Sequence, residues 1–548
     1  MSLGGSARSM AVGTIASRGT GFLRTAVIAS VLGVAGVGDA FNLANTSPNI
    51  VYELLLGGVL TSVVVPLLVR AAATDEDGGT AYAQRLLTLV VLVLGAASVL
   101  LVLGAPLLIG LYGGDLSPSA RDLAIVFARF LLPQVLFYGA GAVMGAYLNT
   151  RGRFGPPMWA PVLNNLVVIA TGLVFHLLPG PDELTTGSIT DTQVTVLGIG
   201  VTLGIVAQTV ALVPALRATG FRFRPRLDLR GSGLGQAARL ARWVFLLVAA
   251  SQAAYFVVVR LATAAGEQEP GRGYTPYVLA YVLWQLPHAV VAVSVITALL
   301  PRMSRAAADG RTGDLRATLD RGLRLSASVL VPAAVAFVVL GRELAVLVFA
   351  RGEVSVDDAR FIGLLLGVFA LGLVPYSLYQ LQLRAFYALA DTRTPTLINL
   401  GVNVVLVVTD LVLYAVLPDA VRVVGLAAGH ATSFLAGLAL CSVVLSRRVG
   451  GLDTAGLRQT VARCLVAVAL PALAAGLLAA LATRLVGDGP LGAAVALAVG
   501  GAALAGGYLL LARRLHVAEV DEVAGPVLRR LGLGRLGLGR PGLGRPGP

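Results

Sequence analysis

The chain has 548 residues, of which 57% are hydrophobic and only 13% are charged. A mean hydropathy of +0.84 excludes an ordinary soluble globular protein and places the chain among multi-spanning membrane proteins. The net charge of +14 could indicate nucleic-acid binding, but the chain contains no lysine and its arginines alternate from loop to loop. Such an alternation is typical of the loops of multi-spanning membrane proteins and argues against nucleic acid as a partner.

Apolar blocks long enough to cross a bilayer recur along the whole chain. A transmembrane helix needs about 20 apolar residues, and about 14 such blocks are present. The sequence therefore predicts an all-α polytopic membrane protein. The expected helices span roughly residues 10–33, 38–70, 84–112, 121–149, 158–179, 194–216, 238–265, 275–301, 322–350, 357–390, 396–417, 421–446, 457–483 and 489–512.

The first expected helix carries a polar stripe. At about 100° per residue, one side collects Thr14, Ser17, Arg18, Gly21, Arg24 and Thr25. A charge is costly in hydrocarbon, so this stripe must face protein or a water-filled cavity. In one interpretation the arginines pair with Asp39 and Glu53 or reach the membrane surface, which suits Arg18. In the other they line a cavity that attracts an anion such as phosphate, which suits Arg24.

The second expected helix is polar in its first half and contains Pro48. Such a helix is typical of a cavity wall rather than a lipid-facing surface. Its polar residues are Asn42, Asn45, Ser47, Asn49 and Glu53. Other polar residues inside apolar blocks, such as Asn164, Asn165, Gln208, Asn399 and Asn403, are expected to make hydrogen bonds between helices. Arg260 needs a partner or a cavity because it is charged.

Arginines mark the loops after the even-numbered helices, whereas the odd-numbered loops are short and several are acidic. By the positive-inside rule this pattern places both termini in the cytoplasm. The arginines are Arg151, Arg153, Arg217, Arg222, Arg224, Arg226, Arg230, Arg302, Arg305, Arg311, Arg316, Arg447 and Arg448, and the acidic loop residues are Asp182, Glu183, Asp191, Glu267 and Glu269.

An internal repeat divides the chain. The spacing from Pro133 to Thr150 equals that from Pro375 to Thr392, and both segments end in a Thr-Arg turn. This repeat predicts two pseudo-symmetric six-helix lobes that meet at a central cavity. The expected division is residues 1–230 and 231–450 for the lobes, 451–512 for two extra C-terminal helices, and 513–548 for a flexible cytoplasmic tail of Gly-Leu-Gly-Arg repeats.

Several segments resemble one known family. SRGTGFLRTAVIASVLGVAGVGDAFNLANTSPN, GAYLNTRGRFGPPMWAPVLNN, QLPHAVVAVSVITALLPRMSR and ALADTRTPTLIN occur in the order and at spacings compatible with the MurJ/MviN family of lipid II flippases. The resemblance covers roughly residues 7–450. It implies the fold of the multidrug/oligosaccharidyl-lipid/polysaccharide exporter superfamily, with the two extra helices forming a groove for a lipid tail. It also implies export of lipid II by alternating access for cell-wall synthesis.

The resemblance also suggests site residues. Arg18, Arg24 and Asp39 match functional residues of the family, and with Asn42, Asn49, Glu53 and Arg260 they form the expected substrate-binding set. Two family arginines are absent, because Tyr52 and Val282 stand at their positions, and Arg260 could compensate. For energy coupling, Asn399, Asn403 and Thr432 could offer oxygens to Na+, or the membrane potential could act alone, without a cofactor.

The expected partners are lipid II, membrane lipids and cell-wall synthesis proteins, and the expected location is the bacterial cytoplasmic membrane. The cysteines and histidines show no metal-ligand or catalytic spacing, and no Walker A motif is present, so an enzyme or ATP-driven pump is not expected. Three alternatives remain: a flippase for another polyprenyl-linked glycan, a cation or drug antiporter of the same architecture, and a transport-inactive scaffold for cell-wall enzymes.

Overall fold

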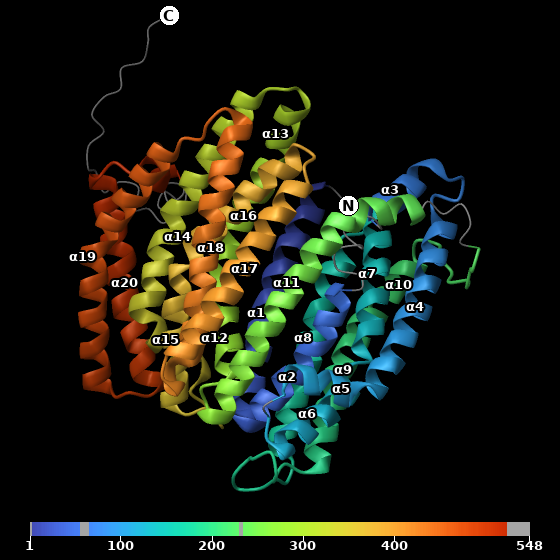
Figure 1. Cartoon of the computed structure of the whole chain (residues 1–548), viewed down its shortest axis with the longest axis horizontal. Coiled ribbons are helices and arrows are strands. Elements are labelled where there is room, and N and C mark those ends of the chain that lie inside the picture. The colour runs from blue at the N-terminus through green and yellow to red at the C-terminus, as the bar shows by residue number, and fades with distance from the viewer. Residues whose placement is uncertain (1–2, 55–64, 115, 229–233, 523–548) are drawn as a thin grey trace, which may run out of the picture. The chain divides into compact units, whose positions relative to one another are not determined.

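The computed structural model describes residues 3–54, 65–114, 116–228 and 234–522 (Figure 1). Within these ranges every regular element is helical. The elements are α1 (Leu3–Leu32), α2 (Gly36–Tyr52), α3 (Val65–Thr74), α4 (Thr80–Leu103), α5 (Ala105–Tyr112), α6 (Pro118–Leu131), α7 (Gln134–Thr150), α8 (Gly155–Leu177), α9 (Asp191–Val210), α10 (Leu212–Arg217), α11 (Leu234–Gln268), α12 (Tyr274–Pro287), η3 (His288–Ala292), α13 (Val293–Ala308), α14 (Thr312–Phe349), α15 (Val356–Leu371), α16 (Leu373–Ala388), α17 (Arg393–Val416), η4 (Asp419–Val421), α18 (Arg422–Val449), α19 (Thr454–Val486) and α20 (Pro490–Arg514).

The helical membrane fold is confirmed, but the expected count of about 14 spans is not. In the described part of the chain, 11 helices are long and apolar enough to cross a membrane, or 12 if the bent pair α15 and α16 is one span. These correspond to the third and later expected helices. The first two expected spans fall on α1, which carries three arginines, and on α2, beyond which residues 55–64 lie outside the described ranges.

The chain forms two compact units. Unit 1 consists of Met1–Trp284, Arg342–Gly372 and Asp391–Gly437, and unit 2 of Gln285–Gly341, Leu373–Ala390 and Leu438–Pro548. The division into two lobes, an extra helix pair and a tail stays a prediction.

In unit 1, α1 packs along α8, and α8 packs against α9. Small residues on α1 permit the close approach, since a Cβ on Gly13 would lie 3.1 Å from the Trp159 indole nitrogen. The Asn165 amide of α8 donates to the Ser17 carbonyl oxygen and to the Thr20 hydroxyl, both at 3.0 Å. One flank of the polar stripe on α1 is therefore a helix contact of the kind expected for Asn165.

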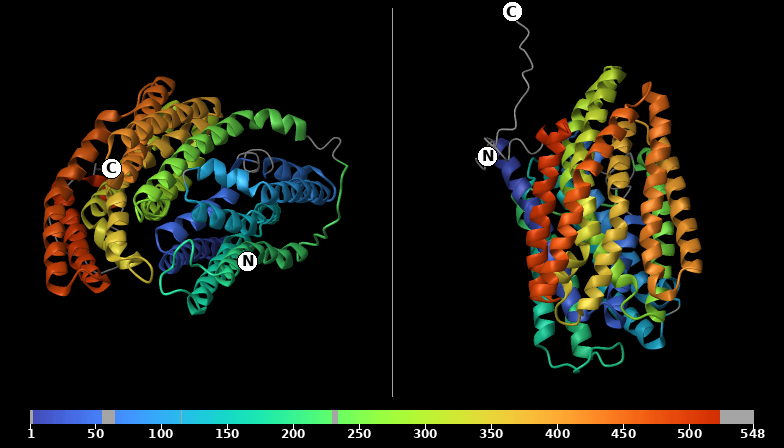
Figure 2. Two further views of the ribbon diagram at one scale, coloured as in Figure 1. Left: turned by 60° about the horizontal axis from the view of Figure 1, so that its bottom comes forward. Right: turned by 90° about the vertical axis from the view of Figure 1, so that its left-hand side faces the viewer.

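In unit 2, α19 and α20 run side by side (Figure 2). Val331 of α14 and Cys464 of α19 belong to their shared apolar core, and the Tyr508 hydroxyl donates to the Ser328 carbonyl oxygen at 2.6 Å. After α20 the chain continues to pack, because Val517 and Val520 are buried in the same core. The ordered chain thus extends past the expected start of the tail at residue 513, and residues 523–548 of that tail lie outside the described ranges.

Candidate functional site

Six helices of unit 1 surround a cavity of about 220 Å³. Its walls come from α1, α2, α7, α8, α9 and α12, and Arg24 of α1 lines it together with Asn42 and Asn49 of α2. The remaining polar residues of the wall are Thr25, Asn45, Gln134, Tyr138 and Asn164. The C-terminal end of the polar stripe of α1, at Arg24 and Thr25, therefore lines one space with the asparagines of α2.

Arg24 is the one charged residue among the described residues that line this cavity. Its side chain is half-buried, and within the described residues its guanidinium makes no hydrogen bond or ion pair. A guanidinium carries five N–H donors and keeps its charge at all physiological pH values. In the described part of the chain, the N–H donors of the Arg24 guanidinium are therefore not engaged by an acidic residue, and the cavity presents a positive group to a ligand.

Neutral amides complete the polar wall. The Asn42 amide donates to the Thr275 hydroxyl at 3.1 Å, and the Asn49 amide donates to the Asn45 carbonyl oxygen at 3.2 Å. The Asn164 side-chain oxygen is buried with no hydrogen-bond partner among the described residues. A buried polar group without a partner is costly, so a ligand that donates a hydrogen bond here would remove that penalty.

Gln134 and Tyr138 are site residues that the sequence analysis missed. The Gln134 amide donates to the Thr202 hydroxyl at 3.0 Å, and the Tyr138 hydroxyl donates to the Gln134 amide oxygen at 3.3 Å. The two residues are four apart on α7 and therefore share a face of that helix. Their spacing after Pro133 is the signal that could have identified them.

Asp39 does not line the cavity. One of its carboxylate oxygens accepts the backbone N–H of Thr275 at 2.7 Å, at the start of α12. The other oxygen lies so close to Gly266 and Gly273 that a Cβ on Gly266 would be 2.7 Å from it. A carboxylate at a helix N-terminus is stabilised by the backbone dipoles. Asp39 therefore links α2 to the turn between α11 and α12. Among the described residues it forms no ion pair with Arg18 or Arg24.

The remaining expected substrate-binding residues lie elsewhere. Arg18 is exposed and Glu53 is exposed at the C-cap of α2, and neither lines the cavity. Arg260 is not among the described residues that line this cavity, because its guanidinium donates to the Leu111 carbonyl oxygen at 3.3 Å and lies beside Gly114 in the α5–α6 connection. Its position is set by a backbone acceptor on a neighbouring helix. Compensation by Arg260 for the absent arginines stays a prediction. Val282, which occupies one family arginine position, does line the cavity.

The proposed cation ligands do not form an oxygen cage. The Asn399 amide oxygen accepts hydrogen bonds from the Ser251 hydroxyl and from the Asn403 amide, both at 3.0 Å. The Thr432 hydroxyl instead donates to the Ala428 carbonyl oxygen at 2.9 Å. Since the Asn399 oxygen is already satisfied and no carboxylate joins it, these side chains fit a contact between α11 and α17 better than a Na+ site. Across the described residues, no cluster of three or more His, Cys, Asp or Glu could hold a metal ion.

Sequence comparisons identify similar proteins. A family model described as lipid II flippase MurJ matches residues 28–492. A probable lipid II flippase MurJ of Rhizobium meliloti is 29% identical over 404 residues, which cover 72% of this chain and 73% of the relative. A probable lipid II flippase MurJ of Vibrio cholerae is 26% identical over 437 residues, which cover 78% of this chain and 80% of the relative.

Structural comparisons agree on the fold. A structure of the lipid II flippase MurJ in an inward closed conformation superposes with a TM-score of 0.73 at 17% identity, and covers 95% of this chain and 99% of that protein. An inward-facing multidrug resistance transporter of the MATE family, in the MOP superfamily, gives a TM-score of 0.65 at 15% identity over 81% of this chain and 96% of that protein. At these identities the matches establish the exporter fold alone.

Proposed function

The chain belongs to the lipid II flippase MurJ family, and from that premise we propose that it moves lipid II from the cytoplasmic to the outer leaflet of the bacterial membrane for cell-wall synthesis. It is an integral membrane protein with many apolar helices. We further propose that both termini lie in the cytoplasm, on the strength of the alternating arginine loops.

Recognition of the headgroup rests on one observation. Arg24 points its guanidinium into a polar cavity without an acidic partner in the described part of the chain. A guanidinium binds two phosphate oxygens at once through parallel N–H groups. Arg24 would therefore hold the diphosphate, while Asn42 and Asn49 replace water around it. The polyprenyl tail would remain in lipid during the alternating-access cycle, and no covalent bond would change.

The membrane potential is the proposed driving force. The diphosphate is an anion, and an inside-negative potential favours outward movement of negative charge. The gain is about 2.3 kcal/mol per elementary charge for each 100 mV. The Asn399 amide oxygen already accepts two hydrogen bonds, so coupling to sodium at this residue is not part of the proposal.

Complementation tests this function. The chain should restore growth to a bacterial strain depleted of its own lipid II flippase, whereas the Arg24→Ala variant at equal protein level should not. A flippase for another polyprenyl-linked glycan would leave the depleted strain unable to grow, and so would a scaffold that recruits cell-wall synthesis proteins. A drug or cation antiporter would give the same negative result, and Arg24 disfavours it because the cavity repels cations.

A further inference from the structure

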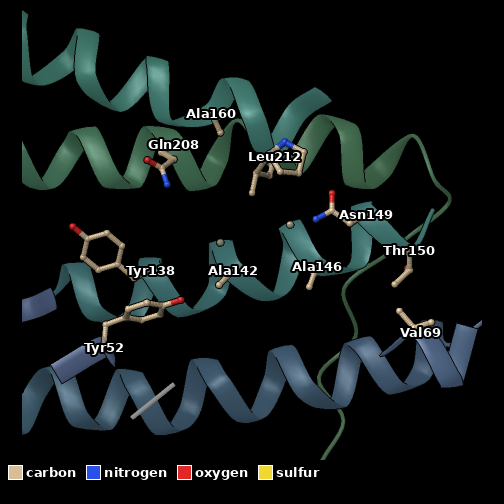
Figure 3. Close-up of a pocket in the computed structure, with 13 residues that line it drawn as sticks. Tyr52, Val69, Tyr138, Ala142, Ala146, Asn149, Thr150, Ala160, Gln208 and Leu212 are labelled. Atoms are coloured by element: carbon tan, nitrogen blue, oxygen red, sulfur yellow. The ribbon is translucent and has the colours of Figure 1, made fainter. Parts of the chain in front are cut away.

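A second and larger cavity of about 490 Å³ adjoins the Arg24 cavity in unit 1 (Figure 3). Tyr138 lines both cavities, so the two spaces meet at this ring. The larger cavity is bounded by α2, α3, α7, α8, α9 and α10. None of the roles assigned so far uses it.

Two tyrosine rings form one end of the larger cavity, as Figure 3 shows. Tyr52 comes from the end of α2 and Tyr138 from α7, with ring centroids 5.7 Å apart and planes inclined by 44°. Tyr52 stands where the resembling family usually has an arginine. An aromatic face attracts the weakly positive C–H groups of a saturated ring. This end of the cavity therefore suits the C–H face of a sugar better than an anion.

The floor of the cavity is built from small residues. Gly141, Ala142, Gly145 and Ala146 all belong to α7 and line the cavity. Residues four apart lie on one face of a helix, so these positions form a continuous strip without bulky side chains. The strip leaves room for a ring to lie along α7.

Two amides in the wall have unused hydrogen-bonding capacity. Gln208 of α9 and Asn149 of α7 line the cavity, and within the described residues neither side chain makes a hydrogen bond. Each amide offers both donors and an acceptor, which matches hydroxyl and acetamido groups. None of the described residues that line this cavity is Asp, Glu, Lys, Arg or His. The wall therefore favours a neutral polar ligand.

We propose that this cavity is a sugar subsite, which holds an N-acetylhexosamine ring of the headgroup while Arg24 holds the diphosphate. The proposal rests on the proposed function and adds a second compartment to the same site. The volume of about 490 Å³ lies within the range of roughly 300–1,000 Å³ for small-molecule pockets. The Arg24 cavity, at about 220 Å³, is below that range and is assigned to the diphosphate alone. The charged and neutral parts of the headgroup therefore occupy separate cavities in this proposal.

Binding of two matched lipids tests the subsite. The probes are undecaprenyl-pyrophosphoryl-N-acetylglucosamine and a capped probe, undecaprenyl pyrophosphate methylated on its terminal phosphate, measured on the full chain in lipid nanodiscs. Both are diphosphate diesters of equal charge, and one carries the sugar where the other carries a methyl group. The wild-type chain should bind the sugar-bearing probe about 2- to 12-fold more tightly, which corresponds to one neutral hydrogen bond. Gln208→Leu and Tyr52→Leu should abolish this preference and leave binding of the capped probe unchanged.

Control variants separate recognition from folding. Tyr52→Phe keeps the ring and should keep the preference. Val210→Ala changes an exposed residue of α9 outside the cavity and should behave as wild type. Equal affinity of the wild-type chain for the two probes would overturn the subsite. Gln208→Leu and Tyr52→Leu variants that lose affinity for both probes equally, or for neither probe, would also overturn it. If the sugar preference is present but the chain fails to complement a flippase-depleted strain, the subsite stands and the proposed function fails.

Discussion

Replacing Arg24 by glutamine should weaken lipid II binding more than any other single change in the polar stripe of α1. The substitution removes the one charge among the described residues that line the smaller cavity and leaves a shorter, neutral polar side chain. Arg24 has no acidic partner among the described residues, so the change leaves no orphaned carboxylate behind. The measured loss would therefore report ligand contacts rather than a broken ion pair.

The expected magnitude follows from the chemistry of the guanidinium. A hydrogen bond to a charged group contributes about 1.5–3 kcal/mol, and about 1.4 kcal/mol corresponds to a tenfold change in affinity. Arg24→Gln should thus weaken lipid II binding by about 10- to 150-fold. Arg24→Lys should fall between wild type and Arg24→Gln, because an ammonium keeps the charge but cannot form the planar pair of hydrogen bonds.

The assay is equilibrium binding of labelled lipid II to purified variants in nanodiscs, with thermal unfolding measured in parallel. Arg18→Gln serves as the matched control, because Arg18 lies on the same helix but is exposed and outside the cavity. Equal affinity of the wild type and Arg24→Gln, with both folded, would refute the role of Arg24. A larger loss for Arg18→Gln than for Arg24→Gln would also refute it.

Three further outcomes follow from packing and charge. Gly273→Ala should lower the free energy of unfolding by about 1–3 kcal/mol, because the new Cβ would overlap an Asp39 carboxylate oxygen and lie 2.7 Å from the Gly266 Cα. An unchanged unfolding temperature would contradict this contact. Gly429→Ala should destabilise α18 against α17, because its Cβ would overlap the buried Asp410 carboxylate. The second change Asp410→Ala should restore stability, and failure to do so would disprove the overlap. In liposomes, an inside-negative potential should accelerate lipid II export and removal of Na+ should not slow it; the reverse pattern would reject the proposed driving force.

Helical glycines that border open space provide the control for both alanine substitutions. A Cβ on Gly95 of α4 or Gly110 of α5 would meet nothing within 4 Å. Alanine at either position should be neutral or stabilise its helix by roughly 0.5–1 kcal/mol. A loss of stability at these positions similar to that at Gly273 would mean that any alanine in this membrane protein is destabilising.

Local periodicity was sufficient to predict part of the site. Arg24, Asn42 and Asn49 follow one another within two consecutive helices, so helical spacing alone indicated a shared polar surface. The structure brings these residues to one cavity. Tyr138 was missed because α7 is mostly apolar, and the four-residue spacing from Gln134 to Tyr138 is a weak signal in such a helix.

Long-range partners could not be predicted from the sequence. The carboxylate of Asp39 meets the N–H of Thr275, which is 236 residues away in the chain. No local sequence pattern encodes that contact. The sequence was therefore equally consistent with an Asp39 paired with an arginine and with an Asp39 that lines the cavity. The same limit applies to Arg260, whose acceptor is the backbone carbonyl of Leu111 and leaves no trace in side-chain composition.

The most direct test of lipid II transport by this chain is translocation by the purified protein. The chain would be reconstituted into liposomes that contain labelled lipid II in both leaflets, with a polymerising or cleaving enzyme added outside. Transport predicts that the fraction of lipid II accessible to the enzyme rises beyond the outer-leaflet share, and that Arg24→Ala liposomes behave like protein-free ones. An accessible fraction that stays at the outer-leaflet share with the folded wild-type protein would contradict the proposed function.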